Sequence, residues 1–319
     1  MSRVTAPEVR ARKGSGQRLV MLTAYDAPGA RVADAAGVDM ILVGDSVADT
    51  VLGYGDTLQV TVADMVHHVA AVARTGPRAM VISDLPWLSY HTGPADAVVN
   101  AGRLVRAGAG AVKLEGGRKR LPVVDALVDA EIPVMGHLGL TPQSVLAMGG
   151  FKVQGRAHRE VRSILDDAAA LAEAGVFAIV LEGIPDAVAR LVTEAVRVPT
   201  IGIGAGRHCD GQVLVFHDLL GLGAASVPKF VRRYATLGAD AVAAIARWAN
   251  DVQDGTFPDD SESYHLPADV TLDMGCDGTT PTADPPGSAD GDMGLAAVTP
   301  VGHAVGERAG RPWPDRRPG

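Results

Sequence analysis

Ionisable side chains follow short apolar segments at intervals along the chain. The segment MILVG ends in Asp45-Ser46, AMVIS ends in Asp84, and PVMG ends in His137. Side chains of these types can bind a metal ion, move a proton or hold an anionic substrate. The candidate functional residues found in this way are Asp45, Ser46, Asp84, Lys113, Glu115, His137 and Glu182.

Three of these residues are carboxylates that together favour a magnesium site. Asp45, Asp84 and Glu115 would repel one another and have raised pKa values unless a cation lay among them. Carboxylate oxygens are hard donors, which suit Mg²⁺ better than a structural zinc ion. Glu182 and Lys113 then remain for proton transfer and for binding an anion.

A purely structural interpretation competes at each position. An acid after a strand often only caps the next helix. Lys113 and Glu115 could form an internal ion pair, and His137, although suited to a hydrogen bond with an oxyanion, could equally be structural. The functional interpretation is favoured by the coincidence of all these residues at the ends of apolar runs, which random surface placement would not produce.

Short buried strands alternating with helices must position these residues. The apolar runs lack period-two alternation, as fully buried parallel strands do. They are Leu19–Thr23, Met40–Val43, Ala79–Ile82, Ala111–Leu114, Pro133–Gly136, Phe177–Leu181, Thr200–Ile203 and Gln212–Phe216. Ala-rich segments of helical length separate or follow them, at Ala27–Ala36, Val62–Ala73, Pro94–Arg106, Leu121–Ala130, Val161–Ala174, Asp186–Ala195 and Ala239–Asp254.

Eight such strands across about 250 residues predict an α/β fold of the (β/α)8 barrel type, with a doubly wound open sheet as the runner-up. In such barrels the chemistry sits at the carboxyl ends of the strands. Strand alternation also places Lys113 and Glu115 on the same face. The candidate residues are therefore expected to gather at one rim of the barrel.

Composition divides the chain into three regions. Residues 1–17 are polar and basic and are expected to form a flexible N-terminal arm, while residues 18–265 are expected to form the catalytic barrel. Residues 266–319 are rich in Pro, Gly and Asp and bury too little apolar surface to offset the entropy of ordering. We therefore expect this C-terminal tail to be disordered.

Charge and cysteine content exclude several classes of protein. The net charge of −8 argues against nucleic acid as a partner, because phosphate binding needs a basic face. The chain has no unbroken apolar stretch of about 18 residues, so no membrane span is expected. Two cysteines cannot make a secreted disulfide framework, and no signal peptide is visible, so a cytoplasmic location is expected.

The strings at the strand ends resemble those of the ketopantoate hydroxymethyltransferase family, also called 3-methyl-2-oxobutanoate hydroxymethyltransferase. The resemblance runs in order from about Leu19 to His265, and its longest strings are GHLGLTPQS (136–144) and GGFKVQGR (149–156). It implies a barrel of the phosphoenolpyruvate/pyruvate type and the hydroxymethyl-transfer step of pantothenate synthesis. It also implies Mg²⁺ dependence, 5,10-methylenetetrahydrofolate as co-substrate, and a homo-oligomer, typically a decamer.

The resemblance also implies a role for each candidate residue. Asp45 and Asp84 match the family's metal ligands, and Glu115 matches its third metal-site carboxylate. Glu182 matches the catalytic base that would form a Mg-stabilised enolate of 3-methyl-2-oxobutanoate. The positions matching those that hold or neighbour the keto acid are Asp45, Ser46, Asp84, Lys113 and His137.

Some positions depart from the family pattern and leave alternatives open. Val47-Ala48-Asp49 replace a small stretch, so that Asp49 adds a negative charge near the expected metal rim, and Arg118-Lys119-Arg120 replace an acidic loop. A phosphoenolpyruvate mutase or 2-methylisocitrate lyase-like enzyme is one alternative, although the K-K-C-G-H string common in such lyases is not found. A non-catalytic barrel homologue is the other.

Overall fold

The computed structural model describes residues 3–223 and 228–270. Its chain divides into two compact units, one up to Ala241 and one from Val242 onward. The first unit therefore ends before the barrel boundary predicted at residue 265. Of the tail predicted to be disordered, residues 266–270 are exposed, and the rest lies outside the described residues.

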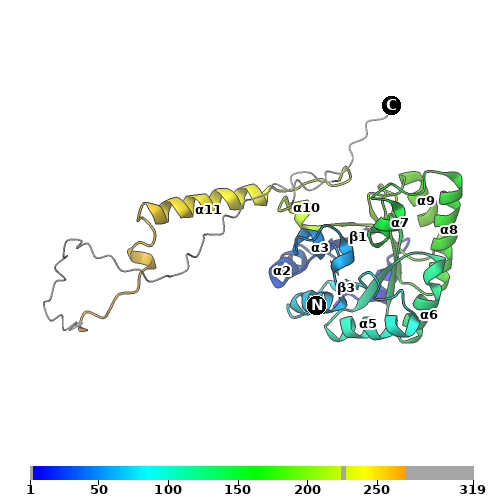
Figure 1. The fold of residues 1–319 in the computed structure, drawn as a ribbon, viewed down its shortest axis with the longest axis horizontal. Coiled ribbons are helices and arrows are strands. Elements are labelled where there is room, and N and C mark those ends of the chain that lie inside the picture. Colours follow the sequence, from blue (N-terminus) through cyan, green and yellow to red (C-terminus); the bar gives the residue numbers. More distant parts are fainter. Residues whose placement is uncertain (1–2, 224–227, 271–319) are drawn as a thin grey trace, which may run out of the picture. The chain divides into compact units, whose positions relative to one another are not determined.

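The first unit is a closed barrel of parallel strands in sequence order, as predicted (Figure 1). Pairing of the first strand with the last closes the sheet, with Leu19 opposite Gly211, and this excludes the doubly wound alternative. The strands are β1 (Leu19–Thr23), β2 (Met40–Val43), β3 (Met80–Asp84), β4 (Ala111–Glu115), β5 (Val134–Gly139), β6 (Ala178–Glu182), β7 (Thr200–Ile203) and β8 (Gly211–Leu214).

Helices cover the outside of this barrel, and α5, α6, α8 and α9 are visible around the strands in Figure 1. The longer helices of the barrel unit closely follow the segments that the sequence predicts. They are α2 (Ala27–Ala35), α4 (Val62–Ala73), α5 (Pro94–Arg106), α6 (Leu121–Asp129), α8 (His158–Glu173) and α9 (Asp186–Ala195). Shorter ones are α3 (Val47–Thr50), α7 (Val145–Met148), α10 (Phe216–Leu220), η1 (Thr57–Gln59), η2 (Arg118–Arg120) and η3 (Pro142–Ser144).

Alternate residues of each strand belong to two separate apolar cores. On β4, Val112 and Leu114 pack in the core that lies between the strands and the helices. Ala111 belongs to the core inside the barrel, so Lys113 and Glu115, two and four residues further on, also point inward. The strand pattern therefore delivers polar side chains to the interior while the opposite face stabilises the fold.

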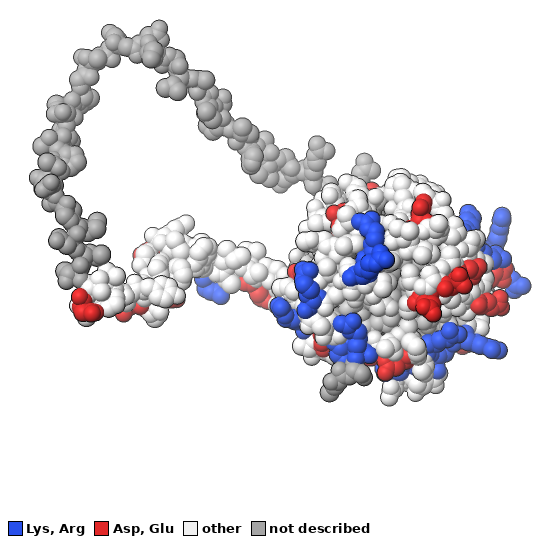
Figure 2. Space-filling model, turned by 90° about the horizontal axis from the view of Figure 1, so that it is seen from below, with Lys and Arg blue, Asp and Glu red and all other residues white. Residues whose placement is uncertain are grey.

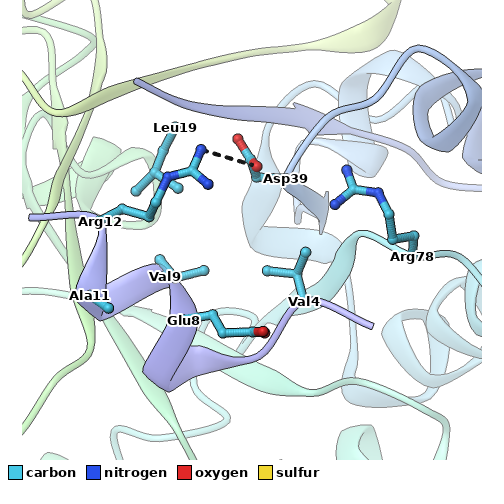
Figure 3. A pocket seen from close by; sticks show the side chains of 8 residues that line it. All are labelled: Val4, Glu8, Val9, Ala11, Arg12, Leu19, Asp39 and Arg78. Atoms are coloured by element: carbon cyan, nitrogen blue, oxygen red, sulfur yellow. Dashed lines mark ion pairs between the residues drawn. The ribbon is translucent and has the colours of Figure 1, made fainter. Parts of the chain in front are cut away.

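A short helix closes the amino-terminal end of the barrel, where the sequence predicts a flexible arm. In α1 (Ala6–Ala11), Val9 is only 1% exposed and joins the inner core with Leu19. The side chain of Arg12 pairs with Asp39 at 3.5 Å beside a cavity of about 480 Å³ (Figure 3). The prediction for residues 1–17 was wrong for this segment, because Val9 and its neighbours cover apolar surface that the strand ends leave open.

The second unit contains most of α11 (Leu237–Gln253) and the turn η4 (Asp260–Glu262). Apolar side chains of α11 are exposed, among them Val242, Ile245 and Trp248. No helix among the described residues is long and apolar enough to cross a membrane. On the face of the barrel unit shown in Figure 2, basic and acidic side chains are interspersed.

Candidate active site

All the residues singled out from the sequence line one pocket at the carboxyl ends of the strands. The pocket has a volume of about 110 Å³ and lies at the end of the barrel opposite to α1. The predicted residues that line it are Asp45, Ser46, Asp84, Lys113, Glu115, His137 and Glu182. The apolar part of its wall includes Leu42, Val180, Ile203 and Val213.

Strand register explains why these side chains meet. Asp84 is the register partner of Lys113, and Glu115 is the partner of His137, so neighbouring strands deliver them side by side. Glu182 ends β6 two residues after the inward-facing Val180, which gives it the same inward direction. The predicted convergence of residues from separate parts of the chain is therefore present.

Lys113 lies among the carboxylates as a buried cation. Its Nζ is 3.0 Å from Asp84 Oδ1, and both side chains are almost completely buried. Burial alone would lower the pKa of Lys113, but the negative charges of Asp84, Glu115 and Asp45 raise it well above its usual range. Lys113 is therefore a permanent positive charge at the bottom of the pocket.

The pKa of Asp45 reflects the excess of negative charge in the pocket. This pKa is raised well above the usual value by burial and by the negative charges of Asp84 and Glu115, against the opposing effects of Lys113 and of a hydrogen bond from Gln143. The backbone N–H of Asp45 donates to Asp84 Oδ2 at 3.1 Å, which ties the two acids together. Four carboxylates line the pocket against Lys113 and His137, and they leave negative charge that a divalent cation would offset.

These oxygens fit a magnesium ion. Asp84 Oδ1 is buried and, apart from its ion pair with Lys113, accepts no hydrogen bond. Within the described part of the chain, no three His, Cys, Asp or Glu side chains are grouped closely enough to hold an ion by themselves. Because Mg²⁺ usually binds one or two carboxylates and completes its shell with water and substrate oxygens, Asp45 and Asp84 match that requirement, with Glu115 nearby.

His137 lies between two acids. Its Nδ1 is 3.4 Å from Glu115 Oε1, and its Nε2 is 3.2 Å from Glu182 Oε2. Burial and Lys113 lower the pKa of His137, but hydrogen bonding to Glu115 and Glu182 more than offsets both and brings the pKa to about 9. Lys113 Nζ also lies 3.2 Å from Nδ1, so both nitrogens of the ring already face charged neighbours.

Ser46 is held by a tyrosine that sequence reasoning did not select. The hydroxyls of Ser46 and Tyr25 lie 2.8 Å apart, and burial raises the pKa of Tyr25 to about 12, so the phenol stays neutral. A Cβ on Gly44 would lie only 2.9 Å from Ser46 Oγ, so a side chain at that position would push the Ser46 hydroxyl aside. This local packing sets the direction of the Ser46 hydroxyl.

Gln143 and Tyr90 are further residues that sequence reasoning missed. Gln143 donates to Asp45 Oδ2 at 2.7 Å, and Tyr90 donates to Gln143 Oε1 at 2.6 Å. Gln143 belongs to the string GHLGLTPQS, so the motif contained the signal although it was used only for the resemblance. A polar residue beside a Pro, buried in a turn, is the feature that could have identified it.

The departures from the family pattern lie outside this pocket. Asp49 is exposed and does not line the cavity. Arg118 pairs with Asp167 of α8 at 3.1 Å, and the guanidinium of Arg120 lies over the ring of Tyr90 at 5.4 Å. Neither the added acid nor these arginines therefore replaces a residue of the pocket wall.

Solved structures share this barrel. A 2,3-dimethylmalate lyase, a member of the PEP mutase/isocitrate lyase superfamily, is 20% identical with a TM-score of 0.53, covering 83% of this chain and 92% of that chain. A phosphonopyruvate hydrolase solved with oxalate and Mg²⁺ is 14% identical with a TM-score of 0.54, covering 82% and 92%. At these identities the likeness shows the fold alone, and it agrees with the predicted barrel of eight parallel strands.

Sequence comparisons are much more specific. The 3-methyl-2-oxobutanoate hydroxymethyltransferase of Moorella thermoacetica is 57% identical, covering 82% of this chain and 98% of that protein. The enzyme named 3-methyl-2-oxobutanoate hydroxymethyltransferase 2 of Bradyrhizobium diazoefficiens is 56% identical, covering 84% and 91%. Because residues 3–260 also match the family described as ketopantoate hydroxymethyltransferase, the chain belongs to that family.

Proposed function

We propose that the protein transfers a hydroxymethyl group from 5,10-methylenetetrahydrofolate to 3-methyl-2-oxobutanoate, giving ketopantoate for pantothenate synthesis. Relatives that are 56–57% identical carry the name of this transferase. The observation that carries the proposal is the pocket itself, where seven residues that match the family's motifs line one cavity of about 110 Å³.

Magnesium is the proposed metal, with Asp45 and Asp84 as its protein ligands and Glu115 as the third carboxylate of the site. The buried oxygen Asp84 Oδ1 and the surplus negative charge around Asp45 support this assignment. When bound, Mg²⁺ would supply Lewis acidity to the carbonyl oxygen of the keto acid.

Glu182 is the proposed base. It ends β6 at the pocket wall, and its Oε2 lies 3.2 Å from His137 Nε2, which orients the carboxylate. Glu182 would take the proton from the tertiary carbon beside the keto group. Lys113, as a permanent cation, would bind the acid end of the substrate, and Lys113 and His137 together would offset the negative charge that develops on the keto oxygen.

The carbon–carbon bond then forms between the deprotonated carbon and the methylene carbon of the folate. Both carbon–nitrogen bonds of the methylene group break, and water supplies the hydroxyl group. The proton taken by Glu182 and the other hydrogen of the water end on the two folate nitrogens, so the products are tetrahydrofolate and ketopantoate. Folate would enter at the barrel mouth, because α1 occupies the other end. We assign no folate-contacting residues.

The two alternative functions have less support. The lyase and the hydrolase described above share the fold at 20% and 14% identity, whereas the two hydroxymethyltransferases are 57% and 56% identical. A non-catalytic homologue would be free to lose pocket residues, yet each of the seven is retained and lines the pocket. We further propose a cytoplasmic homo-oligomer, a decamer as is typical of the family, with small molecules rather than nucleic acid or membrane as partners.

The proposal is tested by incubating the purified protein with Mg²⁺, 5,10-methylenetetrahydrofolate and 3-methyl-2-oxobutanoate and detecting ketopantoate by mass spectrometry. We expect product with the wild type and none with Asp84→Ala. Phosphonopyruvate and 2-methylisocitrate serve as substrates for the alternative. Turnover of either of these without any ketopantoate would replace the proposal by the lyase or mutase function.

A further inference from the structure

One residue from the loop after β5 connects the ends of three other strands through its side chain and its backbone. Gln143 lies in η3 and is only 5% exposed. Its Nε2 donates to Asp45 Oδ2, after β2, at 2.7 Å and to the carbonyl of Leu85, after β3, at 2.9 Å. Its backbone N–H donates to Glu115 Oε2, at the end of β4, at 3.0 Å.

The amide of Gln143 has a single satisfactory orientation. Both hydrogens of Nε2 point at acceptors, and Oε1 accepts from the hydroxyl of Tyr90 at 2.6 Å. Turning the amide over would set Oε1 against the carbonyl oxygen of Leu85, which cannot donate, and would take the N–H donor away from Asp45 Oδ2. Gln143 therefore holds Asp45 in one direction, because its own amide has no alternative arrangement.

A hydrogen bond from Tyr90 holds the amide of Gln143 in this orientation. The side chain of Tyr90 is fully buried, and its hydroxyl accepts from the backbone N–H of Glu115 at 3.2 Å while donating to Gln143. The same hydroxyl thus links the amide of Gln143 to the strand end that carries Glu115. Two of the three metal-site carboxylates are tied into one hydrogen-bond network.

We propose that Gln143 is a positioning residue for the divalent cation. It occupies one oxygen of Asp45, Oδ2, so that the carboxylate meets the cation through its other oxygen, and it holds Glu115 at a fixed distance from that point. Mg²⁺ demands near-ideal octahedral geometry, so freedom of Asp45 to rotate would weaken binding. This inference rests on the metal-dependent function proposed above and extends it to a residue that touches neither metal nor substrate.

Direct metal binding tests the inference without turnover. Mn²⁺, as a paramagnetic substitute for Mg²⁺, is titrated into the full-length metal-free protein, and free Mn²⁺ is measured by electron paramagnetic resonance. Gln143→Met keeps the length of the side chain and removes the amide. Gln17→Met makes the same chemical change at an exposed position before β1 and serves as the matched control.

We expect Gln143→Met to weaken Mn²⁺ binding about 10- to 100-fold, the usual effect of losing a group that orients a metal ligand. Gln17→Met should bind as the wild type does. Tyr90→Phe, which removes only one hydroxyl, should give a smaller loss in the same direction, and it keeps the test decisive if Gln143→Met does not fold. The variants are compared as folded protein, confirmed by circular dichroism, so that lowered stability does not pass for lowered affinity.

Two results would overturn the inference, and they are distinguishable. If folded Gln143→Met binds Mn²⁺ with wild-type affinity, the amide only stabilises the fold. If that variant does not fold, wild-type Mn²⁺ affinity in Tyr90→Phe leads to the same conclusion. Absence of Mn²⁺ binding by the wild type would remove the metal site, and with it this part of the proposed function.

Discussion

Replacing Lys113 by Met should destabilise the metal-free protein by about 3–5 kcal/mol, the cost of breaking a buried ion pair. The Nζ of Lys113 is 3.0 Å from Asp84 Oδ1, with both groups nearly inaccessible to water. At that distance, with an effective dielectric constant of about 20, the attraction is roughly 5–6 kcal/mol. Without the ammonium, the three acids nearest to it, Asp45, Asp84 and Glu115, repel one another and must take up protons or a cation.

The free energy of unfolding is measured by urea denaturation, with and without saturating Mg²⁺. Because Mg²⁺ would offset the lost positive charge, the difference between wild type and Lys113→Met should narrow when the metal is present. Lys152→Met, at an exposed lysine, should stay within about 0.5 kcal/mol of the wild type.

The reasoning fails if Lys113→Met costs less than about 1 kcal/mol without metal, because the ion pair would then contribute no more than a surface pair. A large loss of unfolding free energy that is the same with and without Mg²⁺ would refute a different part of the reasoning. It would mean that the cation does not bind among these carboxylates, and the metal assignment would have to be abandoned.

Three further predictions concern separate parts of the molecule. Glu182→Gln should slow deuterium exchange at the tertiary carbon of 3-methyl-2-oxobutanoate by about 10²–10⁴-fold, as observed by NMR, and unchanged exchange would refute the base assignment. His137→Gln should lose up to about 3 kcal/mol of metal-free stability, because the pKa of about 9 lies above the unfolded value near 6.5. That contribution is complete below pH 6.5 and disappears as pH rises through 9, so urea curves of wild type and variant should converge there. Val9→Asp should lower thermal stability by several degrees, since it buries a charge against the inner core, whereas Arg10→Asp on the exposed side of α1 should not.

The strands and their inward side chains could be predicted from the sequence for a physical reason. Strands buried on both faces appear as short, nearly uninterrupted apolar runs, and any polar residue in such a run must have a partner inside. The alternation that placed Lys113 and Glu115 on one face holds in the barrel, where Val112 and Leu114 pack on the other side. The predicted pocket residues follow from this alternation together with the family motifs.

Other features depend on contacts that are distant in sequence. Gln143 is 98 residues from Asp45 and 28 from Glu115, and no local pattern specifies which acids its amide meets. Helix α1 is six residues long, too short for a helical periodicity to stand out, and it forms where Val9 covers the open end of the barrel. Tertiary packing decides both, so the sequence could mark Gln143 as part of a motif but could reveal neither its partners nor the helix.

The two-sided use of each strand gives a practical route to engineering this protein. Side chains that face the helices, such as Val112 and Leu114, can be varied to raise thermal stability while the pocket residues at the mouth of the barrel stay unchanged. A deletion or insertion of one residue within β4 would damage the pocket. It exchanges the two faces of the strand and turns Lys113 toward the apolar core between the strands and the helices. Libraries built on this scaffold should therefore substitute within the strands and reserve changes of length for the loops.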